Sequence, residues 1–176
     1  MSELTTLHDA IADTIRAAMP KVLQVEAFPE LGKKVRVPAL MFGLTDITPG
    51  VDRGNGKVAL VGRFQSCVLI DATRPKASLQ ASILATQLAT VLKDQWWGDL
   101  DFLTGPPENV HAQPEAPTED LEQFAIWSVQ WTQNFEVGEL VWPWPDEAPG
   151  ALLFGFNDDV KDDFVPAEDF DLDKPA

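Results

Sequence analysis

The chain has 176 residues and a mass of 19.4 kDa, which is the length of one domain with a sizeable core. Its 45% hydrophobic residues and single cysteine are typical of a globular protein of a reducing cytoplasm, and they exclude an intramolecular disulfide and any Cys-based zinc cluster. The net charge of −15 disfavours direct binding to nucleic-acid phosphates, since that affinity comes from Lys and Arg. Neither a signal-peptide pattern nor a run of about 20 apolar residues is found, so we expect no secretion signal and no membrane span.

The first half of the chain begins with a helix pattern. Apolar residues three and four apart in Leu4–Met19 predict an amphipathic helix, which Pro20 ends. The alternation in Val22–Phe28 predicts a short strand, and Pro38–Ile47 predicts a second. Thr48–Lys57 is dense in turn-forming residues and predicts the loop of a hairpin. A phosphate-binding loop is disfavoured there, because no helix start and no Gly-Lys-Ser/Thr follows.

A long strand and a second helix come next. Val58–Asp71 carries apolar residues at even spacing and is predicted to be a strand whose other face is partly buried. Cys67 lies on that second face and is expected to be a small core residue rather than a nucleophile. Pro75 favours helix initiation, and the Ala-rich stretch that follows predicts a helix to about Lys93 that packs closely on a sheet.

The last elements of the body are a long connection and one clear strand. Asp94–Pro117 contains two tryptophans and four prolines, and a loop of this length is usually functional or mobile. Phe124–Val137 predicts a half-buried antiparallel strand, with an apolar face that includes Trp127 and Trp131 and a wet face from Ser128 to Glu136. The order α-β-β-β-α-β predicts an α+β fold, a small and mainly antiparallel sheet flanked by two helices on one side.

Residues 139–176 are predicted to form an extended acidic C-terminal arm, after an α+β domain of residues 1–138. Gly138–Ala176 holds 11 acidic and 2 basic residues, whereas the preceding 137 residues hold 17 and 11. Large apolar side chains in this acidic stretch are expected either to fold back on the body or to contact a neighbouring subunit, as an edge strand or in a groove. They are Trp142, Trp144, Leu153, Phe154, Phe156 and Phe164.

Residues that could support catalysis or metal binding do not form a recognisable pattern. His8 falls on the first predicted helix and His111 in a loop, and both are expected to be solvated surface residues. The acidic run Asp158–Asp163 lacks the alternate ligands, glycine and terminal glutamate of a calcium loop, so a solvated run is favoured over a weak cation site. We therefore expect no enzyme activity, no cofactor and no metal.

The order of elements in Leu4–Val137 resembles that of the tail terminator (tail completion) proteins of long-tailed bacteriophages and phage-tail-like bacteriocins. The segments that carry the resemblance are the opening helix Leu7–Arg16, the strand Val37–Gly43, the strand Val58–Asp71 with the helix after it, and the closing strand Trp127–Trp131. The resemblance covers about three-quarters of the chain and is a pattern of elements without an invariant signature. The acidic extension after Gly138 departs from the smaller members and would suit a contractile tail.

The resemblance implies a homohexameric ring on the last ring of the tail tube. Such a ring stops tail polymerisation and offers a docking face to the head–tail connector, so it is found in the tail or neck of a virion assembled in the host cytoplasm. The implied partners are the tail tube protein, the connector protein and, for a contractile tail, the sheath protein. DNA would pass through an acidic lumen without specific binding, since like charges repel.

A ring subunit also needs loops that project at both rims of the ring. The hairpin loop Thr48–Lys57 and the connection Asp94–Pro117 are the candidates for these rims. Their candidate contact residues are Asp52, Arg53, Asn55, Trp96 and Trp97.

Two functions of other classes remain as alternatives. An acidic DNA-mimic inhibitor of a DNA-binding protein would also be small and strongly acidic, although here the acid is concentrated in a proline-interrupted tail. A small hydrolase or nuclease would need a metal or triad constellation. The oligomeric state distinguishes a DNA mimic from a tail terminator. A mimic should be a monomer or dimer that competes with DNA, whereas a terminator should form rings or bind tube ends.

Overall fold

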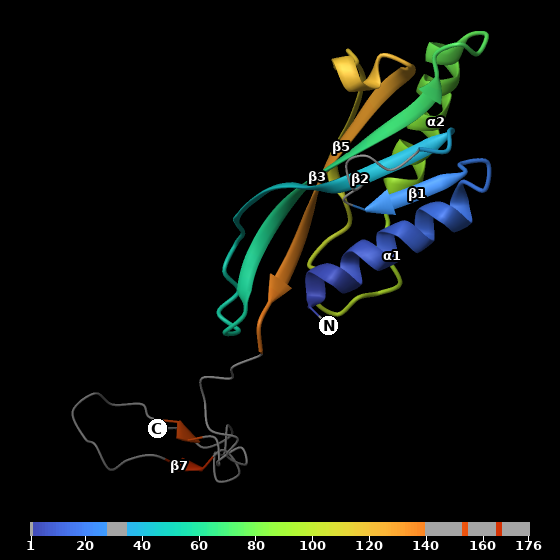
Figure 1. The fold of residues 1–176 in the computed structure, drawn as a ribbon. Coiled ribbons are helices and arrows are strands. Elements are labelled where there is room, and N and C mark those ends of the chain that lie inside the picture. The colour runs from blue at the N-terminus through green and yellow to red at the C-terminus, as the bar shows by residue number, and fades with distance from the viewer. Residues whose placement is uncertain (1, 28–34, 140–152, 155–164, 167–176) are drawn as a thin grey trace, which may run out of the picture. The chain divides into compact units, whose positions relative to one another are not determined.

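The computed structural model describes residues 2–27, 35–139, 153–154 and 165–166. The chain divides into two compact units, Met1–Val141 and Trp142–Ala176. Within the described part of the second unit, Leu153–Phe154 (β6) pairs antiparallel with Val165–Pro166 (β7). The first unit holds the remaining elements and is the subject of the sections that follow (Figure 1).

The first helix, α1, spans Glu3–Ala18 and confirms the predicted amphipathic helix. It begins at Ser2, whose side chain accepts a hydrogen bond from the backbone N–H of Thr5 and so satisfies one free donor of the first turn. It ends at Met19, directly before Pro20. Leu7, Ile11 and Ile15 are buried because the three- and four-residue spacing puts them on one face.

A five-stranded sheet forms the centre of the unit, in the order β1-β2-β3-β5-β4. Its strands are Gln24–Ala27 (β1), Ala39–Pro49 (β2), Val58–Asp71 (β3), Glu108–Glu115 (β4) and Phe124–Val137 (β5). The second helix, Ala77–Leu92 (α2), connects β3 to β4, and a short 3-10 helix, Glu119–Leu121 (η1), precedes β5. β1 and β2 are parallel and the other neighbours antiparallel, which confirms an α+β fold with a mainly antiparallel sheet.

The structure corrects one predicted connection. Asp94–Pro117 is not one long loop, because it contains β4, which pairs with β5 as an edge strand. β4 is polar and exposed, and it contains Pro114, so it lacks the apolar alternation from which the other strands were predicted. The register between Glu108 and His111 is irregular, which bends the start of the strand.

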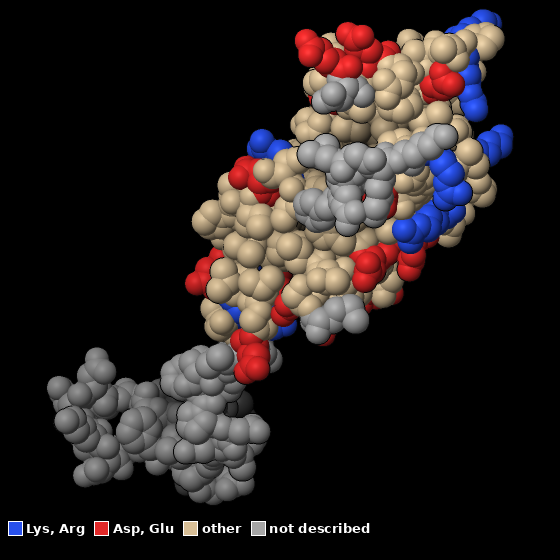
Figure 2. Space-filling model, in the orientation of Figure 1, with Lys and Arg blue, Asp and Glu red and all other residues tan. Residues whose placement is uncertain are grey.

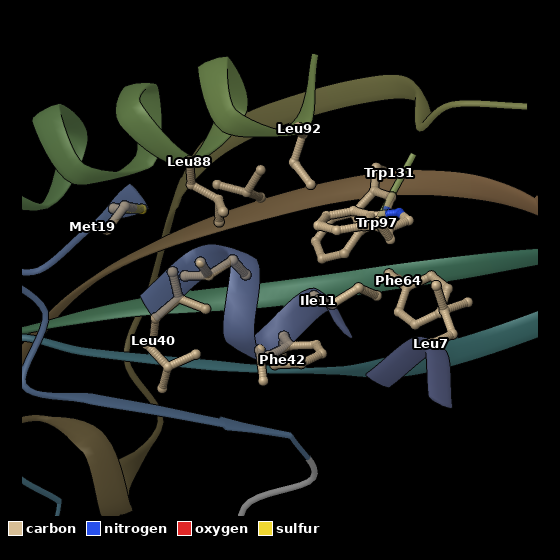
Figure 3. Packing of buried hydrophobic residues seen from close by; sticks show 14 of the residues in the cluster. Leu7, Ile11, Met19, Leu40, Phe42, Phe64, Leu88, Leu92, Trp97 and Trp131 are labelled. Atoms are coloured by element: carbon tan, nitrogen blue, oxygen red, sulfur yellow. The ribbon is translucent and has the colours of Figure 1, made fainter. Parts of the chain in front are cut away.

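Both helices cover the same face of the sheet and form the main core with it. Apolar side chains that alternate along β3 and β5 meet those of α1 and α2 in one layer (Figure 3). Phe64 of β3 stacks on Trp131 of β5 with 5.4 Å between ring centroids. A second, smaller cluster lies on the opposite face and consists of Ala39, Met41, Leu69 and Ile126.

The face of β5 that was predicted to be exposed to solvent is only partly exposed. Ser128 and Glu136 are buried, whereas Gln130, Thr132 and Asn134 are half-buried. Ser128 is covered because the sheet carries its second cluster at that end. Glu136 is covered by the loop between β2 and β3, as described below.

Among the helices of the described residues, none has the length and apolar character to cross a membrane.

Candidate interaction surfaces

The outer half of the β2–β3 hairpin extends past the two helices (Figure 1). β1 pairs with β2 only from Ala39 to Phe42, so the outer edge of β2 beyond Phe42 has no strand partner among the residues that the structure describes. Thr45–Pro49 is exposed throughout, and a register shift at Thr45 interrupts the ladder to β3. Within the described ranges, this part of the sheet therefore presents a strand edge without a partner.

Large apolar side chains are exposed around the same hairpin. Ile47 and Val58 are about half exposed, and Val51 at the turn is 86% exposed. Together with the free edge of β2, these three side chains form a surface that we call the hairpin end. Exposed apolar groups beside an unpaired edge are typical of a contact with another chain.

The loop of the hairpin is held by a buried carboxylate on β5. Glu136 accepts a hydrogen bond from Asn55 Nδ2 at 2.9 Å through Oε2, and its Oε1 lies 3.6 Å from Arg53 Nε. Within the loop, the Asp52 carboxylate accepts from the backbone N–H of Gly54 at 2.8 Å. The predicted rim residues Asp52, Arg53 and Asn55 thus use their side chains to shape the loop and fasten it to the sheet.

The predicted rim tryptophans, Trp96 and Trp97, have different environments. Trp96 is 43% exposed, whereas Trp97 is only 2% exposed and belongs to the main core. Trp97 Nε1 donates to Gln133 Oε1 at 2.9 Å, and Gln133 Nε2 donates to the carbonyl of Gly105 at 2.6 Å. The expectation that Trp97 is a contact residue of a rim loop is therefore wrong, because its ring is buried in the core of the unit.

The two predicted rim segments meet at one end of the sheet. Backbone hydrogen bonds from Thr104 to Asn134 and from Glu136 to Phe102 lay the connection along the edge of β5. Arg53 of the hairpin loop then donates to the carbonyl of Thr104 at 3.4 Å. A hollow of about 370 Å³ opens between the two segments, with Arg53, Thr104 and Asn134 among its lining residues.

The predicted contact residues of the arm lie almost entirely outside the described residues. Trp142, Trp144, Phe156 and Phe164 are among those outside. Leu153 and Phe154 are described only as the strand β6, paired with β7. Their contact with a neighbouring subunit stays a prediction.

The two histidines differ in burial. His111 is exposed, as predicted. His8 is 7% exposed, so the prediction of a solvated side chain is wrong. Its Nδ1–H donates to the carbonyl of Leu4 at 2.7 Å, and its ring stacks on Phe42 with 5.9 Å between centroids. Position 8 is next to Leu7 and one helical turn after Leu4, so it lies at the border of the buried face of α1. An aromatic side chain there can pack against the sheet.

Among the described residues, the remaining titratable groups form no cluster with the geometry of a metal site. In the described ranges, no three His, Cys, Asp or Glu side chains gather closely enough to hold an ion. Burial raises the pKa of the Cys67 thiol, and the nearby Glu115 carboxylate raises it further, while a hydrogen bond with Gln65 acts in the opposite direction. A raised pKa lowers the fraction of thiolate, which is the nucleophilic form.

Comparison with known proteins gives distant likenesses among solved structures. No family model matches the chain, and no curated protein matches it. A solved structure that matches is the sheath/tube terminator, in its extended state, of an extracellular contractile injection system, PVC. The two chains are 15% identical with a TM-score of 0.37, and the match covers 90% of this chain. This chain spans 65% of the length of that terminator.

Proposed function

We propose that this chain is a structural subunit that caps a tail tube as a ring. In this role it ends tail polymerisation, forms the docking face for a head or neck connector and, on a contractile tail, meets the last sheath ring. The proposed assembly is a homohexamer, its neighbours are the tube, connector and sheath proteins, and the subunit performs no catalysis. The compared terminator bears a related role in its name, but the proposal rests on the surface of this chain.

The observation that carries the proposal is the hairpin end. A protein that works alone usually covers or shortens its sheet edges, because an exposed edge pairs with other chains. Here the outer edge of β2 is free among the described residues, and Ile47, Val51 and Val58 are exposed beside it. An edge with apolar neighbours suits a repeated contact between identical subunits, and such head-to-tail contacts close into rings.

Three features that restrict strand pairing along this edge are consistent with a contact to one specific partner. The shift at Thr45, where Thr45 Oγ1 donates to the carbonyl of Arg63 at 3.0 Å, interrupts the ladder. Asp46 places a charge in the exposed stretch, and Pro49 ends it. Bulges, charges and prolines are the devices by which natural edges avoid indiscriminate aggregation. The free stretch therefore supports pairing over a few residues with one defined partner.

The test is the assembly state of the purified full chain. Light scattering after size exclusion and negative-stain images should show rings, formed by the protein alone or on the ends of tail tubes. The Ile47→Asp variant should lose these rings, because it replaces an exposed apolar side chain of the hairpin end with a carboxylate. Ser78→Asp adds the same charge at an exposed position in the first turn of α2 and should leave the rings intact. A monomer or dimer that displaces DNA from a DNA-binding protein would instead support a DNA-mimic inhibitor.

A further inference from the structure

The exposed large apolar side chains of the first unit gather at two places. One place is the hairpin end. The other lies where α1 ends and α2 begins, and there Leu23, Leu79 and Ile83 are 59%, 53% and 49% exposed. Among the described residues, the only other exposed large apolar side chains are Trp96 and Val110. Apolar groups concentrated at two places of one unit indicate either two contacts with other chains or the two sides of a single contact.

The second place is a groove between the end of α1 and the outer side of α2. It consists of two hollows of about 380 and 360 Å³, which join because Lys21, Leu84 and Gln87 line both. Leu23 and Ile83 are among the residues that line the second hollow. The groove is therefore concave and partly apolar, whereas the hairpin end projects past the two helices (Figure 1).

The hairpin end and the groove lie at opposite ends of the same strand. β3 begins with Val58 of the hairpin end, and Ile70, its last residue but one, lines the groove. The twelve steps between them correspond to about 40 Å at the rise of a strand. β3 is paired with β5 over this whole length, so the hairpin end cannot fold back to the groove of its own molecule. The two surfaces can therefore meet only between different copies of the chain.

The charges at the two surfaces are complementary. The charged side chains among the described lining of the groove are Lys21 and Arg74, both cations. Figure 2 shows Lys and Arg side chains along the side of the unit where α1 ends and α2 begins. At the turn of the hairpin, the exposed Asp52 follows Val51, while Arg53 is held by the hydrogen bond and ion pair described above. A turn with an apolar side chain and a carboxylate matches an apolar groove with cations.

We propose that the hairpin end of one copy docks into the groove between α1 and α2 of a second copy. Val51 covers Leu23 and Ile83, and the Asp52 carboxylate pairs with the cations of the groove. Because the two surfaces are different, the contact is head-to-tail and repeats from copy to copy until a ring closes. The closure into a ring rests on the proposed function, and the new element is the surface that receives the hairpin end.

Mixing two variants that cannot assemble alone tests this contact. Ile47→Asp disables the hairpin end and Ile83→Asp disables the groove, so each purified full-length variant should be a monomer in analytical ultracentrifugation. An equimolar mixture should form dimers, because Ile83→Asp supplies an intact hairpin end and Ile47→Asp supplies an intact groove. The double variant Ile47→Asp/Ile83→Asp has neither surface, so its mixture with Ile47→Asp should stay monomeric. Both positions are exposed, and circular dichroism verifies that each variant is folded.

Charge reversal in the groove provides a second measurement with an internal control. Lys21→Glu/Arg74→Glu, added to the copy that supplies the groove, should raise the dissociation constant of the mixed dimer at least tenfold. The same change in the copy that supplies the hairpin end should leave the constant within twofold, because the groove of that copy is not used.

Three outcomes separate this contact from the proposed function. A mixture of the two variants that stays monomeric, or equal effects of charge reversal in the two copies, would overturn the contact. Rings of Ile83→Asp that still cap tail tubes would overturn it and leave the proposed function intact. Open filaments of the wild-type chain that disappear in Ile83→Asp would support the contact and contradict a closed cap.

Discussion

Gln133 and Glu136 stand on β5 as polar side chains in buried surroundings, and each fastens a separate segment to the sheet. The amide of Gln133 links Trp97 to Gly105, and the carboxylate of Glu136 holds Asn55. A buried polar group that loses its partner costs about 1–3 kcal/mol, because it has lost water without gaining a hydrogen bond. Two residues that resemble surface residues in the sequence therefore help to hold the connection and the hairpin loop on the sheet.

Replacement of Gln133 by leucine should lower the free energy of unfolding by about 2–4 kcal/mol, because it leaves the indole N–H of Trp97 and the carbonyl of Gly105 without their partner. Urea unfolding followed by tryptophan fluorescence measures the change. Gln130→Leu makes the same substitution on the same strand at a half-buried position on the opposite face, and it should change stability by less than about 1 kcal/mol. Equal losses in both variants would contradict the bridging role of Gln133.

The Cys67 thiol should react more slowly in the folded chain than in the unfolded chain. Burial and the Glu115 carboxylate raise its pKa, so the thiolate forms at a higher pH in the native state. The unfolded chain loses this proton first, so the contribution of Cys67 to stability falls as the pH rises from the unfolded pKa towards the folded one. The rate of alkylation by iodoacetamide, measured against pH with and without urea, gives the pKa of Cys67 in the unfolded and in the native chain.

The Glu115→Gln variant is the control for this assignment. It removes the charge that lies 4.0 Å from Cys67 Sγ and should move the native midpoint of alkylation to a lower pH. Coincident midpoints for the native and unfolded wild-type chain would contradict the raised pKa.

For single residues, the sequence predicted the apolar faces of helices and strands correctly, but it did not predict the burial of side chains outside a periodic pattern. Phe64 and Trp131 were expected on apolar faces because their alternation has the period of a strand. Trp96 and Trp97 are adjacent, identical and outside any periodic pattern, so nothing local distinguishes the exposed ring from the buried one. His8 is buried because Phe42, far away in the sequence, supplies a stacking partner.

Gly62 marks the place where β3 passes under a crowded part of the core, which is a property of the strand pairing. A Cβ at Gly62 would lie 2.9 Å from Leu44 Cδ1 and 2.9 Å from a ring carbon of Phe135. Leu44 belongs to β2 and Phe135 to β5, so three neighbouring strands close around the missing side chain. The glycine is therefore required by packing rather than by an unusual backbone conformation.

The Gly62→Ala variant should be destabilised by about 1–3 kcal/mol, because the buried ring of Phe135 must move to admit the methyl group. Gly105→Ala is the matched control, since the nearest heavy atom to its added Cβ is at 3.9 Å. Thermal unfolding followed by circular dichroism compares the two variants. If the two midpoints fall by the same amount, crowding at Gly62 is not the cause.

Among the elements, long periodic segments could be predicted and short polar ones could not. α1, β3 and β5 each carry many regularly spaced apolar residues, and their positions were confirmed within one or two residues. β4 gave no such signal because it is an exposed edge strand, stabilised by its ladder to β5. The parallel pairing of β1 with β2 depends on the path between them, which no local pattern encodes.

For the whole molecule, the packed core formed by the described residues lies within the first unit. Val137 is the last residue of the main cluster and its flanking side chains, and the first unit ends at Val141. Both helices and all five strands of the central sheet lie before that point. The stability of the sheet should therefore depend little on the acidic stretch that follows.

Deletion of Val141–Ala176 should leave a folded body but weaken assembly. The truncated chain should keep its circular dichroism spectrum and a cooperative thermal transition, because the main cluster is intact. Its ring formation, measured by light scattering and negative stain, should decrease. The Trp142→Ala/Trp144→Ala variant should also decrease ring assembly if the two indole side chains contact a neighbouring subunit. A truncated chain that assembles as well as the full chain would contradict a gripping role for the C-terminal segment.

β3 and β5 pair residue for residue over fourteen consecutive positions, from Val58 opposite Val137 to Asp71 opposite Phe124, without an irregularity. Because successive side chains alternate between faces, one inserted residue in the middle of β3 would exchange the inner and outer faces of everything beyond it. Evolutionary changes in the length of this ribbon should therefore occur in even steps, with a matching change in the opposite strand. Odd steps should be found only where a bulge restores the alternation.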